Sequence, residues 1–233
     1  MSWLFNTIIY HPLLNALVVL YDTVSFGDIG IAIVMLTVVI RLISLPLSLR
    51  TIRSQREMAE LAPEIERIKE KHKNDQAAQG QAMMDLYKQH KVNPLAGCLP
   101  LLIQFPVLFG LYRVFINIFK PESLQALYSF VPDPGTIQTV SLGIVDLGVR
   151  SIPLAVAAGL AQFIQAKVAA PLQQSGQAAM LNKQMMYFFP VLIIVISWNL
   201  PAGLALYWTV TTLASIAEQW YIKRKPTHGT VTA

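Results

Sequence analysis

Hydrophobic residues follow one another almost without a break from position 29 to position 49. A helix of about 20 apolar residues, rising about 1.5 Å per residue, matches the hydrocarbon thickness of a bilayer. The polar residues of this stretch are spaced four, three and four positions apart: Thr37, Arg41, Ser44 and Ser48. Because that spacing places them on one face of a helix, residues 29–49 predict a membrane-spanning helix with one polar face and an arginine near its middle.

Arg41 lies too deep in this helix to be an ordinary surface residue. Inserting an arginine at the centre of a bilayer costs on the order of 3 kcal/mol. We expect no buried ion pair, because Glu218, the nearest acidic candidate in another apolar run, lies close to the end of that run. Two interpretations remain. Arg41 extends to the surface or bonds backbone carbonyl groups, or it presents its charge in a water-filled cavity, which we favour.

Four more apolar runs predict further membrane-spanning helices, at residues 99–119, 152–170, 185–200 and 202–222. Between the second and third helices lies a Pro/Gly/Ser-rich loop at 120–151, and a shorter loop at 171–184 leads to the fourth. The predicted fold is therefore all-α and integral to the membrane, with five transmembrane helices.

The first 28 residues are apolar but interrupted by recurrent polar residues: Thr7, His11, Asn15 and Asp22. Residues 3–22 are thus expected to be too interrupted to span the membrane, and they predict an amphipathic helix lying flat in its interface. Trp3, Tyr10 and Tyr21 would anchor this helix, because amphipathic aromatic rings favour the interface. A turn at residues 25–30 leads into the first spanning helix.

Residues 50–92 are the most charged part of the chain, with nine Lys/Arg and seven Asp/Glu. Two apolar faces recur at helical spacing there, the first made by Met58, Leu61, Ile65 and Ile68, the second by Met83, Leu86, Tyr87 and His90. Glu64–Arg67 is one of several opposite-charge pairs three residues apart. Pro63 is expected to open or kink the first helix, and Asn74 and Asp75 to form a turn. The pattern predicts a helical hairpin in water.

The composition supports a membrane protein, with 54% hydrophobic and only 13% charged residues. A soluble domain carries about 25% charged residues. A single cysteine, Cys98, excludes an internal disulfide, and the four histidines are dispersed, so we expect no metal site and no cofactor.

Lysine and arginine are concentrated on one side of the predicted membrane. Fourteen lie in the hairpin, the loop around Lys167–Lys183 and the basic tail 223–233, against two, Lys120 and Arg150, on the other side. Because basic loops stay in the cytoplasm, the N-terminus is expected outside and the C-terminus inside. The sequence starts with neither a cleavable-signal pattern nor an Arg-rich transit peptide, which favours a bacterial plasma membrane.

Polar residues recur on one face of other predicted helices: Gln104 in the second, Gln162 and Gln165 in the third, and Trp208, Thr211 and Ser215 in the fifth. Serine and threonine in such helices often serve only packing, but several polar faces together favour a shared groove. No pattern of nucleophile and base, paired carboxylates or phosphate loop is evident, so we expect no enzyme. A transporter would show inverted repeats. A positively charged groove near a cytoplasmic hairpin favours reception of a polypeptide segment.

Two motifs carry a resemblance to a known family. NPLAGCLPLLIQFP at 93–106 and NLPAGLALYW at 199–208 resemble the signatures of the YidC-type membrane protein insertases, which include the mitochondrial oxidase-assembly and chloroplast Albino proteins. The resemblance covers nearly the whole chain. It implies an insertase or chaperone that uses no nucleotide, and it places Arg41, Thr37, Tyr207 and Trp208 on the substrate groove. Further groove candidates are Ser44, Gln104, Gln162, Gln165, Trp198, Thr211 and Ser215.

The resemblance also implies partners, namely nascent membrane proteins and lipid, with the Sec translocon, the signal-recognition-particle receptor and the ribosome as further candidates. Charged hairpin residues are the candidates for partner contacts: Glu64, Arg67, Lys71, Lys73, Asp85 and Lys88. The chain departs from many members by lacking a large periplasmic domain, a lipoprotein signal and a long basic tail. We therefore expect no strong ribosome docking through the tail, and no sequence-specific binding of nucleic acid.

Overall fold

Long helices joined by short turns make up most of the computed structural model, which describes residues 2–93, 99–169 and 176–224. The helices are α1 (Ser2–Phe5), the π-helical turn η1 (Asn6–Tyr10), α2 (His11–Thr23), α3 (Ile29–Glu60), α4 (Ala62–Lys71), α5 (Gln76–Gln89), α6 (Leu99–Asn117), the 3-10 helix η3 (Pro121–Ala126), α7 (Ile152–Ala169), α8 (Gly176–Trp198) and α9 (Ala202–Arg224). The prediction of a helical protein is thereby confirmed at the level of fold class.

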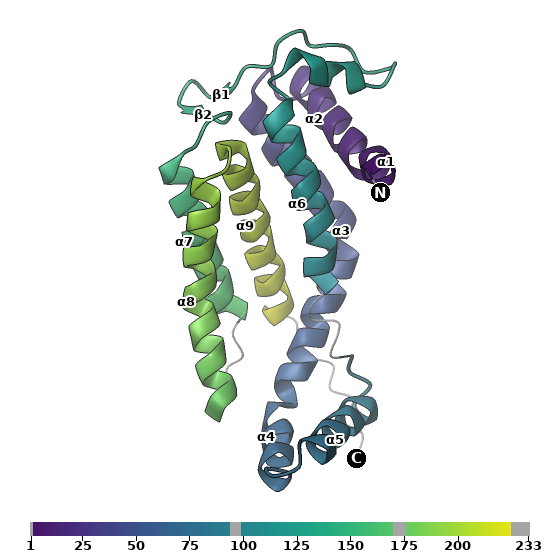
Figure 1. Cartoon of the computed structure of the whole chain (residues 1–233), viewed down its shortest axis with the longest axis vertical. Helices are drawn as coiled ribbons and strands as arrows, with labels where there is room; N and C mark the ends of the chain where they lie inside the picture. The colour runs from purple at the N-terminus through teal and green to yellow at the C-terminus, as the bar shows by residue number, and fades with distance from the viewer. Residues whose placement is uncertain (1, 94–98, 170–175, 225–233) are drawn as a thin grey trace.

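Helices α3, α6, α7, α8 and α9 follow the long axis of the molecule (Figure 1). Helices α7 and α8 lie side by side, α3 and α6 lie on the other side, and α9 contacts both groups. The hairpin of α4 and α5 projects from one end, which we call the hairpin end. Helix α2 and the segment between α6 and α7 cover the opposite end, which we call the loop end.

Among the described residues, three helical stretches are long and apolar enough to cross a membrane: Trp3–Thr23, Ile29–Glu60 and Ile152–Ala169. Lys183–Trp198 is a shorter apolar helix. The stretch that holds residues 3–22 is therefore long and apolar enough to span despite its scattered polar residues. Its position flat in the membrane interface stays a prediction.

Two helices extend beyond the apolar runs that predicted them. Helix α3 continues without a break to Glu60, eleven residues past the predicted boundary at residue 49, because the charged residues that follow are good helix formers. Helix α8 begins at Gly176, within the predicted loop 171–184. Hydropathy marks where a chain can contact lipid, and a helix has no need to end there.

The segment 120–151 carries a small antiparallel hairpin in addition to η3. Strand β1 (Val140–Ser141) pairs with β2 (Val145–Asp146), with Val140 opposite Asp146. The Asp28 carboxylate holds this hairpin against α3: it caps the helix at the Ile31 N–H and accepts hydrogen bonds from Ser141 and Leu142. Burial alone would raise the pKa of Asp28, but these hydrogen bonds outweigh it and hold the pKa below its usual value.

A second polar residue fastens the same segment to α2. The Asn15 side chain is buried, donates hydrogen bonds to the carbonyls of His11 and Ala126, and accepts one from the Tyr128 N–H at 2.7 Å. Asn15 belongs to the polar face predicted for residues 3–22, and its amide pairs there with backbone groups of the segment that covers α2.

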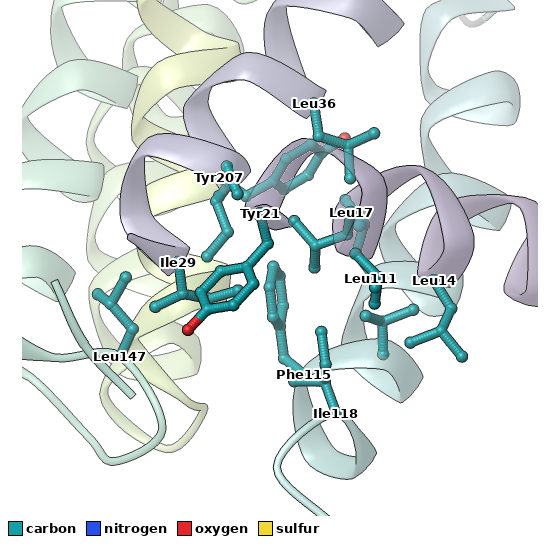
Figure 2. Close-up of a cluster of buried hydrophobic side chains, with 14 of the residues drawn as sticks. Leu14, Leu17, Tyr21, Ile29, Leu36, Leu111, Phe115, Ile118, Leu147 and Tyr207 are labelled. Carbon is teal, nitrogen blue, oxygen red and sulfur yellow. The ribbon is translucent and has the colours of Figure 1, made fainter. Parts of the chain in front are cut away.

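The main hydrophobic core lies toward the loop end (Figure 2). It combines side chains of α2, the first part of α3, the last part of α6 and the start of α9, among them Leu14, Leu17, Ile29, Leu36, Leu111, Phe115, Ile118 and Tyr207. Gly203 makes the contact of α9 with α3 and α6 possible, since a Cβ there would lie 3.3 Å from Ile33 and from Phe115. The core fixes the relative positions of α3, α6 and α9.

The hairpin of α4 and α5 has a small core of its own. Leu61, Leu86 and Val92 are buried together, with Met58, Ile65, Ile68 and Tyr87 packed against them. The two predicted apolar faces therefore meet, and α4 begins at Ala62 with Pro63 in its first turn, as the sequence predicts. Asp75 caps α5 by accepting from the N–H groups of Ala77 and Ala78. His90 lies outside this core and faces Glu64 at 3.7 Å.

Candidate functional site

A pocket opens between α3, α6 and α9, on the hairpin side of the main core. Its volume is about 60 Å3, which is room for several water molecules, since one water needs about 10–15 Å3. The lining mixes three aliphatic side chains with polar ones: Ile40, Arg41, Ser44, Leu47, Ser48, Thr51, Gln104, Val107, Tyr207 and Thr211. Arg41 is the one charged residue among them.

Helix periodicity places these residues in the pocket. Arg41, Ser44 and Ser48 follow one another at three and four residues on α3, as Tyr207 and Thr211 do at four residues on α9. Each set therefore lies on one face, and the two faces meet because α3 packs directly on α9. Gln104, in the part of α6 nearer the hairpin end, donates a hydrogen bond to the Tyr207 hydroxyl and closes the pocket from the third side.

Arg41 is held by three residues of α9. Its Nη2 donates to the Thr211 carbonyl and the Ser215 hydroxyl, and its Nη1 lies 3.5 Å from Oε1 of Glu218. The expectation that Arg41 has no buried ion pair is therefore wrong. Glu218 lies deeper along α9 than Arg41 does along α3, but an arginine side chain is long enough to cover the difference. The sequence left open whether Arg41 bonds a backbone carbonyl, and the structure shows this bond at Thr211.

The ion pair is largely removed from solvent. The side chains of Arg41 and Glu218 keep 17% and 9% of their exposure. The second carboxylate oxygen of Glu218 accepts a hydrogen bond from the Ser48 hydroxyl. Among the described buried side-chain atoms, Nε of Arg41 and Oε1 of Gln219 have no hydrogen-bond partner. The Nε–H group of Arg41 therefore remains a donor without an acceptor among the described residues.

The structure brings five predicted groove residues into the pocket lining: Arg41, Ser44, Gln104, Tyr207 and Thr211. Ser215 lies next to it as a partner of Arg41. The other predicted groove residues lie elsewhere. Thr37 is buried, and its hydroxyl donates to the Ile33 carbonyl of its own helix at 2.6 Å. Trp198 is half exposed at the end of α8.

Trp208 and Gln162 form a separate contact on the other side of α9. The indole N–H of Trp208 donates to Oε1 of Gln162 at 3.4 Å, which joins α9 to α7. Gln165, one turn further along α7, does not line the pocket. Trp208 lies outside the pocket because it is on the face of α9 that packs on α7 and not on α3. Gln162 and Gln165 lie outside the pocket because they belong to α7 itself. The helical spacing of polar residues alone could not separate these two faces.

Three polar residues of the site are missing from the predicted groove residues: Ser48, Thr51 and Glu218. Ser48 belongs to the polar face predicted for residues 29–49, and Thr51 continues that face by one turn beyond the predicted end of the helix. Glu218 follows Thr211 and Ser215 at helical spacing on α9. Its position near the end of the apolar run is the reason that the sequence argued against an ion pair with Arg41.

The candidate partner residues of the hairpin are at its surface. Arg67, Lys71 and Lys73 are exposed. Lys88 lies 4.0 Å from Asp85 in an exposed pair, and Glu64 faces His90 across the two helices. Exposed pairs of this kind contribute about 0–1 kcal/mol, so these charges remain available to a partner. In the described part of the chain, no three His, Cys, Asp or Glu residues gather as metal ligands.

Fold and site together define a class: a multi-pass helical membrane protein with an arginine-bearing polar pocket among its helices. The family model described as "60Kd inner membrane protein" matches residues 19–228, so the chain belongs to that family. The family description and the apolar helices together make the chain a multi-pass protein of a bacterial inner membrane.

Known proteins similar to this chain carry the name of an insertase. The chain is 37% identical over 219 residues to "Membrane protein insertase YidC" of Fusobacterium nucleatum subsp. nucleatum, covering 93% of this chain and 98% of that protein. A protein of the same name from Nitratidesulfovibrio vulgaris (strain DP4) is 36% identical over 217 residues, but only 39% of its length is covered.

A solved structure agrees with this. "Active YidC insertase crystal structure with the first transmembrane domain resolved" matches 93% of this chain with a TM-score of 0.62 and 27% identity, and 46% of that chain is covered. The chain thus spans nearly all of the first relative and less than half of the other two proteins. The predicted membership of the YidC-type family is confirmed.

Proposed function

We propose that this protein is a membrane protein insertase that receives a hydrophilic segment of a nascent membrane protein in the polar pocket and releases the following hydrophobic helix into lipid. The observation that carries the proposal is the pocket itself: polar side chains from α3, α6 and α9 gather around Arg41. The insertase names of the relatives support the same activity.

The proposed topology has five transmembrane helices, α3, α6, α7, α8 and α9, with α1 and α2 in the outer interface. Helix α6 has 19 residues and α9 has 23. At about 1.5 Å per residue they measure about 28 and 35 Å, against about 30 Å of hydrocarbon. The bias of lysine and arginine toward the hairpin end puts α4, α5 and the C-terminus in the cytoplasm and the loop end outside.

In the proposed mechanism the hydrophilic segment enters the pocket from the hairpin end. Hydroxyl and amide groups of Ser44, Ser48, Thr51 and Gln104 replace part of its hydration, and the guanidinium of Arg41 attracts acidic groups. At an effective dielectric constant of about 20, two unit charges at about 4 Å attract by about 4 kcal/mol. This is enough to favour entry and small enough to permit release.

The hydrophobic helix of the substrate then leaves along α6 into lipid. Phe105 and Phe109 of α6 are exposed, with ring centroids 6.2 Å apart, and present an apolar surface beside the pocket. Apolar burial stabilises the substrate helix in lipid by about 25 cal/mol per Å2. No covalent step or cofactor is needed.

The hairpin of α4 and α5 is the proposed contact for targeting partners. Its exposed charges suit the Sec translocon, the signal-recognition-particle receptor or the ribosome, and its separate core lets it hold its shape outside the membrane. We propose no sequence-specific contact with nucleic acid. Thr37, Gln162, Gln165, Trp198 and Trp208 are proposed to support the helices around the groove.

The decisive experiment uses liposomes that hold only the purified protein and a single-span substrate with an acidic N-terminal segment. Protease protection of that segment reports insertion. We expect protection to depend on the protein, to persist in Arg41→Lys and to fall in Arg41→Ala. If Arg41→Ala inserts the acidic substrate as well as the wild type, the charged pocket is not the receiving site. Flux of solutes or ions without a substrate would indicate a transporter instead.

A further inference from the structure

The ion pair between Arg41 and Glu218 has a consequence for what the pocket accepts. Arg41 and Ser48 line the pocket, whereas Glu218 is not among the lining residues and contacts both of them from outside the lining. The positive charge that faces an incoming segment is therefore already compensated from within the chain. In electrostatic terms the resting pocket presents a buried dipole with its positive end forward, and not an isolated cation.

The guanidinium is also largely occupied. Nη1 faces Glu218, and Nη2 donates to Thr211 and Ser215. A carboxylate from a substrate can bind Arg41 in the two-pronged way that arginine favours only by displacing one of these partners. Among these partners Glu218 alone is a carboxylate, like the incoming group. Replacing it by a substrate carboxylate therefore leaves Arg41 paired with one negative charge.

We propose that Glu218 determines the charge selectivity of the pocket, as an internal counter-ion that a substrate carboxylate must replace at Arg41. This inference rests on the proposed insertase function. In the wild type the exchange keeps the preference for acidic segments small, so neutral polar segments that bond the surrounding hydroxyl groups are also accepted. When the substrate moves on, Glu218 returns to Arg41 and completes release.

The test compares two single-span substrates that differ only in the N-terminal segment, one with aspartates and one with asparagines at the same positions. Insertion into liposomes holding the full chain is measured by protease protection, and the ratio of acidic to neutral insertion is the readout. Glu218→Gln keeps the shape of the side chain and frees the charge of Arg41. We expect the ratio to rise about tenfold, equivalent to about 1.4 kcal/mol.

Three further variants separate selectivity from folding. Glu57→Gln removes the same charge from an exposed site on α3, about 24 Å along the helix from Arg41, and should leave the ratio unchanged. Ser48→Ala removes the hydrogen bond to Glu218 together with one hydroxyl of the pocket lining, which serves both substrates alike, and it should raise the ratio less than Glu218→Gln does. The double variant Arg41→Gln with Glu218→Gln should lose the preference gained by Glu218→Gln alone.

The outcomes distinguish the two proposals. If the wild type inserts neither substrate, the insertase function fails, and this inference fails with it. If the wild type inserts both substrates and Glu218→Gln leaves the ratio unchanged, only the selectivity role of Glu218 is refuted. An equal fall in both substrates, with Ser48→Ala also without effect on the ratio, would make Glu218 a structural counter-ion and would overturn the inference.

Discussion

Asp28 joins the outer loop to α3, and replacing it by alanine should loosen both. Its Oδ1 accepts hydrogen bonds from the Ile31 N–H at 2.9 Å and the Ser141 hydroxyl at 2.7 Å, and its Oδ2 accepts one from the Leu142 N–H at 2.6 Å. Loss of an N-cap costs about 1 kcal/mol, and each hydrogen bond to a charged acceptor contributes about 1.5 kcal/mol at the lower limit. Because the site is partly exposed, we expect Asp28→Ala to lower the free energy of unfolding by about 3 kcal/mol in total.

The pH dependence follows from the lowered pKa of Asp28. A carboxyl group whose pKa is lower in the folded than in the unfolded protein stabilises the fold fully above the unfolded pKa, about 3.9. That stability is lost as the pH falls through the lower, folded pKa of Asp28. The wild type should therefore lose stability below about pH 4 more steeply than Asp28→Asn, which has no proton to gain.

Urea unfolding in detergent, followed by tryptophan fluorescence, measures both effects, and limited proteolysis reports release of the loop at 120–151. Asp133→Ala is the matched control, because Asp133 is exposed and its carboxylate bonds the N–H of Gly135 within the same loop. The reasoning fails if Asp28→Ala unfolds at the wild-type urea concentration with its loop equally resistant to protease. It also fails if Asp133→Ala is as harmful as Asp28→Ala.

Three further predictions concern packing. Asn15→Ala should lower the free energy of unfolding by about 2–3 kcal/mol, because the Ala126 carbonyl and the Tyr128 N–H lose their partner; an unchanged thermal unfolding temperature would contradict this. Leu86→Ala should destabilise the hairpin by about 2–3 kcal/mol, because Leu86 is buried in its core, and should speed hydrogen exchange in α4 and α5. Faster exchange in α9 as well would contradict a separate hairpin core. Gly203→Ala should lower the unfolding temperature through its contacts with α3 and α6, while Gly80→Ala, with open space around it, should raise stability by about 0.5–1 kcal/mol; equal effects of the two would refute the packing argument.

The apolar runs predicted the starts of two helices well. Helices α7 and α9 begin at the predicted residues 152 and 202, where Pro153 lies in the first turn of α7 and Pro201 directly precedes α9. The end of α3 and the start of α8 could not be found in this way, since polar helix formers continue each helix beyond its apolar part. The short strands β1 and β2, with two residues each, carry too little pattern to be predicted.

The candidate site could be predicted as far as each helix determines its own polar face. Five candidates meet in one pocket because single-helix periodicity fixes their direction. Prediction of the ion pair requires knowing how far along α3 and α9 the two residues lie relative to one another. Arg41 lies about 18 Å from the start of α3, and Glu218 about 24 Å from the start of α9, a difference that the arginine side chain spans. The sequence shows neither the shared starting level of α3 and α9 nor their contact.

Core and pocket divide the same three helices between them, and Tyr207 lies at the boundary. The core uses the parts of α3, α6 and α9 nearer the loop end, including Ile33, Phe115 and Gly203, while the pocket uses the parts nearer the hairpin end. The Tyr207 ring packs in the core, and its hydroxyl accepts the hydrogen bond of Gln104 in the pocket. The pocket is therefore held in place by apolar packing outside it. In the proposed mechanism the polar side chains exchange partners with a substrate while this apolar packing holds the three helices in place.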